Sequence, residues 1–112
     1  MKELIEFAEF LELEKKLEIR FGTIKTVERV PKSTKLLKLT VSFGSGVTKT
    51  VVTNIGDKIS IPETLLDVTL PFIMNLKPSK IMGITSEAMI MVAENTEGGI
   101  EFQRFSDGAK LL

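Results

Sequence analysis

Residues 17–30, LEIRFGTIKTVERV, indicate a long β-strand that bends partway along its length. Leu17, Ile19 and Phe21 alternate with charged residues, which is typical of a strand with one buried face. After Gly22 the apolar positions shift to Ile24, and a glycine at such a shift indicates a β-bulge. Because bulges turn strands around the corners of small barrels, this stretch predicts a closed β fold.

Shorter stretches with a strand pattern follow at close spacing. They are residues 37–43, 47–53, 68–76 and 86–93, with a short last strand near residues 100–105. A Gly-Ser-Gly turn is expected at 44–46, one helical turn is expected from Pro62, and residues 77–85 are expected to form a loop. Five or six short strands favour a small sandwich or barrel. Their spacing fits an OB-type barrel but does not separate it from an SH3-like barrel.

One helix is expected ahead of the strands. Residues 2–16 are strong helix formers without Gly or Pro, and apolar residues recur at helical spacing from Leu4 to Leu11. We expect the 112 residues to form one domain, with an N-terminal helix (1–16), a barrel (17–93) and a C-terminal extension (94–112). The predicted fold class is all-β: a five-stranded OB-type Greek-key barrel with an N-terminal α-helix and a short C-terminal strand extension.

Composition excludes several function classes. The chain has no Cys and no His, which excludes disulfide scaffolds, zinc fingers, cysteine nucleophiles and catalysis by imidazole. Its carboxylates are scattered and it has no phosphate-binding glycine loop, so we expect no catalytic residue, no metal and no cofactor. No apolar run approaches the ~20 residues of a membrane span, and the glutamate-rich N-terminus is unlike a signal peptide. We therefore expect a cytoplasmic protein without a membrane partner.

The formal net charge is zero, but the charge is unevenly distributed. Residues 1–18 carry six Glu against three Lys, residues 19–60 carry eight bases against two acids, and residues 61–112 carry seven acids against four bases. The middle block therefore indicates a surface that faces a polyanion. The competing interpretation is an ordinary solvated strand and loop. The densest part of the block contains Lys25, Arg29, Lys32, Lys35 and Lys38.

Three segments, taken together, resemble a known family. They are Leu17–Ile24 (LEIRFGTI), Val30–Leu39 (VPKSTKLLKL) and Asn75–Met91 (NLKPSKIMGITSEAMIM). In this order and spacing they resemble the tRNA-binding OB domain. That domain occurs as a free-standing tRNA-binding protein, as the C-terminal or β portion of methionyl-tRNA synthetases, and in the endothelial monocyte-activating polypeptide. The resemblance covers about residues 10–110.

The resemblance implies a barrel that binds tRNA by its shape, at the outer corner of the L, without reading the anticodon. It implies tRNA as the partner, and a role as a free-standing protein or as a trans-acting subunit of an aminoacyl-tRNA synthetase, with the methionyl enzyme favoured. One branch of the same fold resembles a secretion-associated chaperone that binds unfolded peptides in the same groove. Peptide binding is therefore the alternative function.

Eight residues are candidates for tRNA contact. Lys77 and Lys80 lie in a loop expected near the lip of the groove, and Ser86 and Met89 correspond to positions of the family's tRNA-facing motif. The amide of Asn75 suits a ribose or phosphate, but it could equally cap a strand-to-loop turn. The hydroxyl of Ser86 could instead satisfy the turn backbone, and Met89 could be a core or dimer contact. The full set is Lys32, Lys35, Lys38, Asn75, Lys77, Lys80, Ser86 and Met89.

Apolar and aromatic residues carry two further expectations. There is no Trp or Tyr, so a folded RNA backbone is favoured over single strands, which stack on exposed rings. The helix at 2–16 is apolar on more than one face, and Ile100, Phe102 and Phe105 add apolar surface near the other end. Such surfaces predict a homodimer; the alternative is that the helix caps the mouth of its own barrel. The resemblance likewise implies that short free-standing members pair as homodimers.

Overall fold

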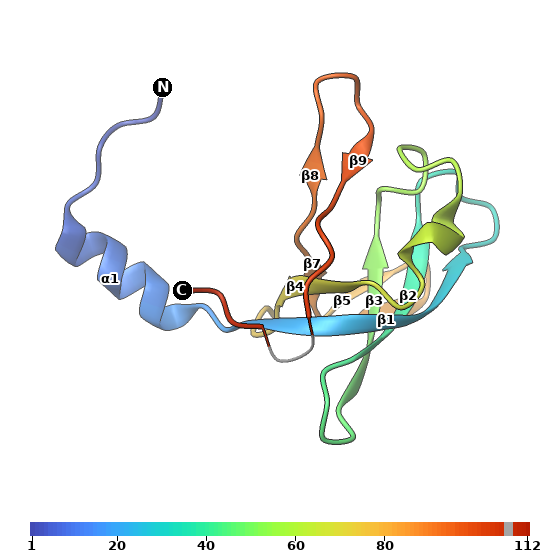
Figure 1. Ribbon diagram of the computed structural model, residues 1–112, viewed down its shortest axis with the longest axis horizontal. Coiled ribbons are helices and arrows are strands. Elements are labelled where there is room, and N and C mark those ends of the chain that lie inside the picture. The colour runs from blue at the N-terminus through green and yellow to red at the C-terminus, as the bar shows by residue number, and fades with distance from the viewer. Residues whose placement is uncertain (107–108) are drawn as a thin grey trace.

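Strand β1 (Ile19–Arg29) is the central strand of a five-stranded antiparallel sheet in the computed structural model, which describes residues 1–106 and 109–112. The sheet order is β3-β2-β1-β4-β7. Its other strands are β2 (Leu37–Ser42), β3 (Thr48–Thr53), β4 (Thr69–Ile73) and β7 (Met89–Ile90). The sheet curls until its two edge strands approach each other (Figure 1). This mostly-β architecture with one N-terminal helix confirms the predicted fold class.

The bend in β1 lets one strand pair with two neighbours. Its first part, from Ile19 to Thr23, pairs with β4, and the part from Thr23 onward pairs with β2. The register against β2 shifts between Ile24 and Thr26. The irregularity therefore lies at Lys25. An irregularity in this strand is confirmed, but its predicted position at Gly22 is wrong.

The change of apolar phase at Gly22 has another cause. Phe21 lies on the outer side of the strand, where its ring packs on that of Phe105 at a centroid distance of 5.0 Å. Gly22 faces inward, and a Cβ at this position would lie 2.5 Å from the ring of Phe43. Real Cβ atoms do not approach so closely, so the position under the Phe43 ring requires glycine.

The core is built from alternate residues of the strands. Leu37, Leu39 and Val41 on the inner face of β2 are fully buried, as the period-2 pattern predicts. Phe72 from β4 is also fully buried and meets the ring of Phe43 edge-on, with centroids 5.4 Å apart. Burying a side chain of this kind contributes about 1.5–3 kcal/mol, so these strands hold the curled sheet together.

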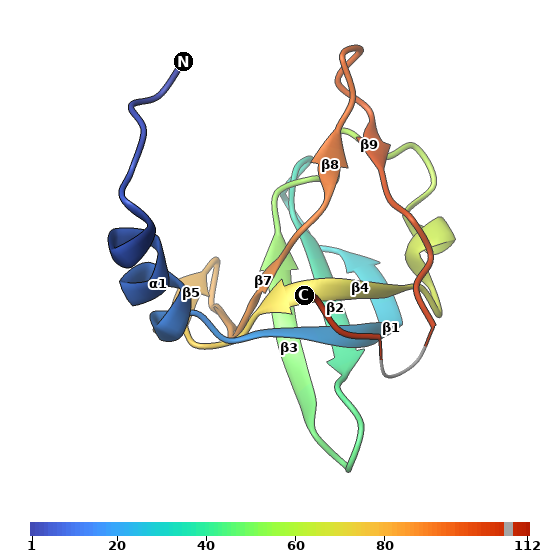
Figure 2. The same ribbon diagram turned by 60° about the vertical axis from the view of Figure 1, so that its left-hand side comes forward.

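Helix α1 (Phe7–Lys16) is shorter than the predicted helix over residues 2–16 and has no buried residue. Residues 1–6 are not helical, because an isolated helix gains little without an apolar face to pack on and Glu6 provides no side-chain cap. The helix lies beside the barrel, away from its core (Figures 1 and 2). It therefore does not cap the mouth of its own barrel.

Smaller elements connect the strands. A 3-10 turn, η1 (Pro62–Leu65), begins at proline as expected. Residues 77–85, expected as a loop, include a short hairpin of β5 (Ser79–Ile81) and β6 (Ile84–Ser86), which turns through Met82 and Gly83, both with positive φ. The expected strand at 86–93 is broken, and β8 (Ala93–Glu94) pairs with β9 (Ile100–Glu101) in a hairpin that projects from the sheet (Figure 1).

Asp107 and Gly108, whose residue types predict a turn, lie outside the described residues. Within the residues that are described, no helix has the length and apolar character needed to cross a membrane.

Candidate nucleic-acid interface

An open groove of about 620 Å³ lies along the line where β3 meets the segment around β7. One wall comes from Leu36 and from residues 52–55. The other comes from Leu76, Lys77, Ser86 and residues 88–92. The groove therefore joins the loop before β2 to the loop after β4, which are about forty residues apart in the chain.

The loop before β2 is held by its own hydrogen bonds. The hydroxyl oxygen of Ser33 accepts from the backbone N–H of Lys35 at 3.3 Å and of Leu36 at 3.1 Å. The carbonyl oxygen of Lys35 accepts from Gly56 N–H at 2.7 Å. With its backbone fixed in this way, the loop places Leu36 in the groove wall and leaves the side chains of Lys32 and Lys35 exposed.

Several cations of the basic block are already paired. Lys25 Nζ lies 3.7 Å from Asp67, and Lys38 Nζ lies 3.9 Å from Glu28. Both pairs are solvent-exposed, and such pairs are weak, so a phosphate can compete for either lysine. Lys38 nevertheless differs from Lys32 and Lys35. Among the described residues, no carboxylate lies within 4.0 Å of the ammonium group of Lys32 or Lys35.

The arginines of the block serve the barrel itself. Arg29 donates to the carbonyl oxygen of Gly56 at 2.9 Å and to that of Ile59 at 3.5 Å. Arg20 donates to the carbonyl oxygen of Phe43 at 3.3 Å. Their charge contributes to the local field, but their donors are partly used by backbone oxygens, so lysines provide most of the free cationic groups.

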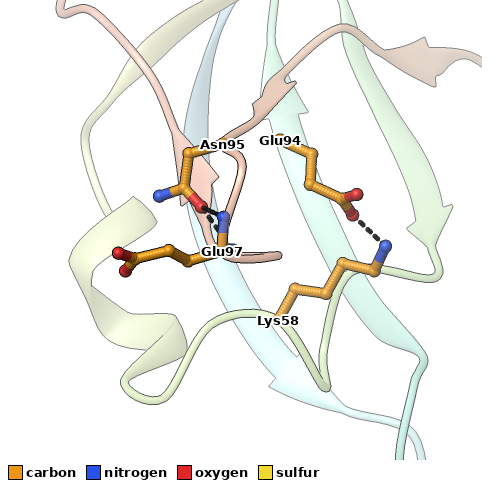
Figure 3. A network of polar contacts seen from close by, with 5 residues as sticks. Lys58, Glu94, Asn95 and Glu97 are labelled. Atoms are coloured by element: carbon orange, nitrogen blue, oxygen red, sulfur yellow. Dashed lines mark hydrogen bonds and ion pairs between the residues drawn. The ribbon is translucent and has the colours of Figure 1, made fainter.

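Lys58 is paired with a residue of the β8–β9 hairpin. Its ammonium donates to the carboxylate of Glu94 at the base of the β8–β9 hairpin (Figure 3). This hydrogen bond, followed by the attraction between the two charges, raises the pKa of Lys58. Asn95 shapes the hairpin turn, because its side-chain oxygen accepts from the N–H groups of Glu97 and Gly99 at 3.0 and 2.9 Å.

Lys77 and Lys80 remain available in the segment that follows β4. Both side chains are exposed, and neither ammonium lies within 4.0 Å of a carboxylate among the described residues. Lys77 lines the groove and Lys80 lies in β5, opposite Thr85. The structure thus brings Lys77 to the same groove as Leu36, the neighbour of Lys35.

Ser86 closes the barrel. Its side chain is 8% exposed, and its hydroxyl oxygen accepts from Val52 N–H at 2.9 Å. The next residue, Glu87, makes two further hydrogen bonds to β3. Its backbone N–H donates to the carbonyl oxygen of Thr50, and its carboxylate accepts from Thr50 N–H, both at 2.8 Å. Sequence reasoning missed this role of Glu87, because nothing in the chain pattern pairs residue 87 with residue 50.

Met89 lies on the rim of the groove. Its side chain is 52% exposed, whereas its neighbours Ala88 and Ile90 are 7% and 9% exposed. Met91 is also exposed, and both methionines line the groove. An unbranched thioether at such a rim adapts to the shape of a ligand.

Asn75 does not line the groove, although its neighbours Leu76 and Lys77 do. Its side-chain oxygen accepts from Glu18 N–H at 2.9 Å, and its amide nitrogen donates to the carbonyl oxygen of Lys16. The residue therefore joins the end of α1 to the loop that follows β4.

The sequence that forms this groove matches a known protein family. The model of a family described as "Putative tRNA binding domain" matches residues 19–110. The methionine–tRNA ligase of Bacteroides fragilis is 42% identical over 96 residues, which is 86% of this chain and 13% of that protein. The chain thus spans about an eighth of the length of such curated relatives.

Solved structures show the same fold. A protein related to methionyl-tRNA synthetase from Pyrococcus horikoshii has a TM-score of 0.78 and 32% identity, covering 96% of this chain and 94% of that one. The chaperone CsaA from Bacillus anthracis has a TM-score of 0.73 at 22% identity, covering 98% and 100%. At that identity, the chaperone supports the fold alone.

Proposed function

Because this chain belongs to the tRNA-binding domain family, we propose that it is a non-catalytic module that binds tRNA through the groove between β3 and β7. The observation that carries the proposal is the meeting of two loops at this groove. One loop carries the exposed Lys32 and Lys35 and contributes Leu36 to the groove. Lys77 of the other loop lines the groove itself, and the exposed Lys80 lies three residues further on, in β5. Lysines placed in this way neutralise phosphates and release counterions without reading sequence.

The packing of the aromatic rings in the barrel favours recognition of the shape of the RNA over stacking of its bases. Phe43 is buried, and Phe21 is packed on Phe105, so the barrel offers no row of open rings for unstacked bases. A folded RNA backbone fits a rigid groove that has Lys77 in one wall and Lys32 and Lys35 in the loop that contributes Leu36 to the other wall. We therefore infer that intact tRNA binds more tightly than single-stranded RNA of the same length.

The remaining candidates take different parts in this proposal. Met89 contacts the RNA from the rim, and Lys38 joins the contact when it leaves Glu28. Ser86 is proposed to act by holding the seam that shapes the groove, because its hydroxyl is buried and hydrogen-bonded to Val52.

The cellular role follows from the relatives. Methionine–tRNA ligases carry a similar segment as 13% of their length. The chain also resembles a protein related to methionyl-tRNA synthetase, over 96% of this chain and 94% of that one. We propose that it serves a synthetase, the methionyl enzyme foremost, by binding tRNA in trans and raising its local concentration. Such a partner would place it in the cytoplasm.

A homodimer is the proposed assembly. Phe7, Phe10 and Leu13 on α1 are 72%, 43% and 52% exposed, and α1 contributes nothing to the core of its own barrel. A second copy related by a two-fold axis would cover this surface. It would also give one RNA two basic grooves.

A filter-binding titration of bulk tRNA at several salt concentrations tests the function. We expect affinity to fall with salt, and a Lys32→Ala, Lys35→Ala, Lys77→Ala variant to flatten the slope by about 0.7–0.9 per lost phosphate contact. Single-stranded RNA of equal length is the control ligand. Equal binding of both RNAs, or an unchanged slope in the variant, would contradict the proposal.

Peptide binding is the second candidate, favoured by the exposed Met89 and Met91 in the groove. An unfolded polypeptide added to the same titration distinguishes the two. We expect it not to compete with tRNA; binding of the polypeptide without binding of tRNA would favour the chaperone function.

A further inference from the structure

The end of α1 and the loop after β4 are fastened together by three hydrogen bonds. Two come from the side chain of Asn75, which accepts from Glu18 N–H at 2.9 Å and donates to the carbonyl oxygen of Lys16. The third runs from Met74 N–H to the carbonyl oxygen of Glu18 at 2.8 Å. A single side chain thus bridges segments 57 to 59 residues apart in the chain.

This junction brings cations from both segments to one place. Lys15 and Lys16 form the last turn of α1, and Lys77 follows Asn75 by two residues, a span of at most about 7 Å between Cα atoms. All three side chains are exposed. Although Glu14 and Glu18 are close in the chain, no described carboxylate lies within 4.0 Å of the ammonium groups of Lys15 or Lys16.

We propose that Asn75 is a positioning residue, which extends the RNA-binding surface from the groove onto the last turn of α1. Lys15 and Lys16 then contact phosphates of the same RNA that Lys77 contacts. This inference rests on the proposed tRNA binding. It assigns two lysines to the RNA site from a segment whose net charge is negative. Asn75 then acts by holding α1 in place, and it does not itself contact the RNA.

The hydrogen bonds that the Asn75 amide already makes suit it to this positioning role. The amide uses its oxygen and one N–H within the junction, so little of its bonding capacity remains for a ribose or phosphate. Loss of the side chain leaves the lysines in the chain but releases the helix that carries them. A freed helix must be ordered again on binding, and this lowers the affinity.

The test is a double-mutant cycle in the full-length chain, measured by filter binding of bulk tRNA over a salt series. Lys15→Gln with Lys16→Gln should lower the salt slope by about 1.4–1.8, the value for two phosphate contacts. A matched pair, Lys2→Gln with Lys58→Gln, removes one charge ahead of the helix and one that is already paired with Glu94, and should leave the slope nearly unchanged.

Asn75→Ala as a single substitution should lower the affinity for tRNA. The same substitution should have a much smaller effect in the Lys15→Gln, Lys16→Gln background, because the effects of mutating coupled residues are not additive. Asn75→Asp retains the size and the acceptor but loses the donor to Lys16, and should act in the same direction. Circular dichroism and sedimentation of each variant check that fold and mass are retained.

Two results would overturn the inference while leaving the proposed function intact. One is a Lys15, Lys16 variant that binds like the matched pair. The other is an Asn75→Ala loss of the same factor in both backgrounds, which would indicate direct contact with RNA. Failure of the unchanged chain to bind tRNA would overturn the proposed function and this inference with it.

Discussion

The hydroxyl oxygen of Ser86 accepts a 2.9 Å hydrogen bond from the backbone N–H of Val52, and so joins β6 to β3, an edge strand of the curled sheet. Glu87 makes a similar contact with Thr50. The barrel is therefore closed at this line by side chains as well as by backbone. The same segment lines the groove, so the stability of the barrel and the shape of the groove depend on the same residues.

Ser86→Ala should lower the free energy of unfolding by about 1–3 kcal/mol, because it leaves the N–H of Val52 buried without its partner. Urea unfolding followed by circular dichroism measures the change. Ser79→Ala is the matched control, since Ser79 is exposed in β5. Equal stability of the two variants would contradict the role assigned to Ser86.

Lys38→Gln should reduce tRNA affinity less than Lys35→Gln. The ammonium of Lys38 lies 3.9 Å from Glu28, so contact with a phosphate requires it to leave that carboxylate, whereas Lys35 has no such partner among the described residues. Glu28→Gln should correspondingly raise affinity. Titration of bulk tRNA at one low salt concentration compares the three variants, and a larger loss for Lys38→Gln would show that the pair does not restrain it.

Replacing Phe7, Phe10 and Leu13 together with Ala should convert the proposed dimer into a monomer. Alanine retains helix propensity while removing the exposed apolar side chains of α1. Sedimentation equilibrium at micromolar concentration should give the 12.4 kDa of one chain for this variant and twice that mass for the unchanged chain. Glu9→Ala with Glu12→Ala is the control. A single-chain mass for the unchanged protein would refute the dimer.

Glu94→Gln should lower the pKa of Lys58 toward its ordinary value. The hydrogen bond to Glu94 raises this pKa in the folded chain, so its contribution is complete below the pKa of the unfolded chain and is lost as pH rises through the folded value. The contact between the hairpin and Lys58 should therefore persist at neutral pH and weaken only in strong alkali. An NMR titration of the Lys58 side chain measures it, with Glu97→Gln as the control.

The fold could be predicted from local patterns because each strand buries one face. The alternation from Leu37 to Val41 corresponds to buried inner positions, and Pro62 begins a helical turn as expected. The bulge was misplaced because Phe21, an apolar residue, faces outward onto Phe105. A hydrophobic pattern does not distinguish a ring in the core from a ring packed outside it.

The candidate site could be predicted only in part. The lysines were found by their density, but their partners depend on contacts that no short pattern contains. Asp67 pairs with Lys25 across more than forty residues, and the hydroxyl of Ser86 reaches Val52 across 34. For the same reason Asn75 and Ser86 stood out as polar residues in a motif, while the bonds that occupy them became visible only in the folded chain.

The shared strand β1 also determines the order in which the barrel can assemble. Its pairing with β2 joins residues close in the chain, so the meander of β1, β2 and β3 can form from successive hairpins. The other half of β1 can pair only after β4 is available, since the hydroxyls of Thr23 and Thr69, which lie 46 residues apart in the chain, are hydrogen-bonded across this strand pair. Long loops close slowly, and topologies with distant strand pairs fold more slowly than local ones. During synthesis on a ribosome, the first three strands can therefore form while the barrel stays open until β4 has emerged.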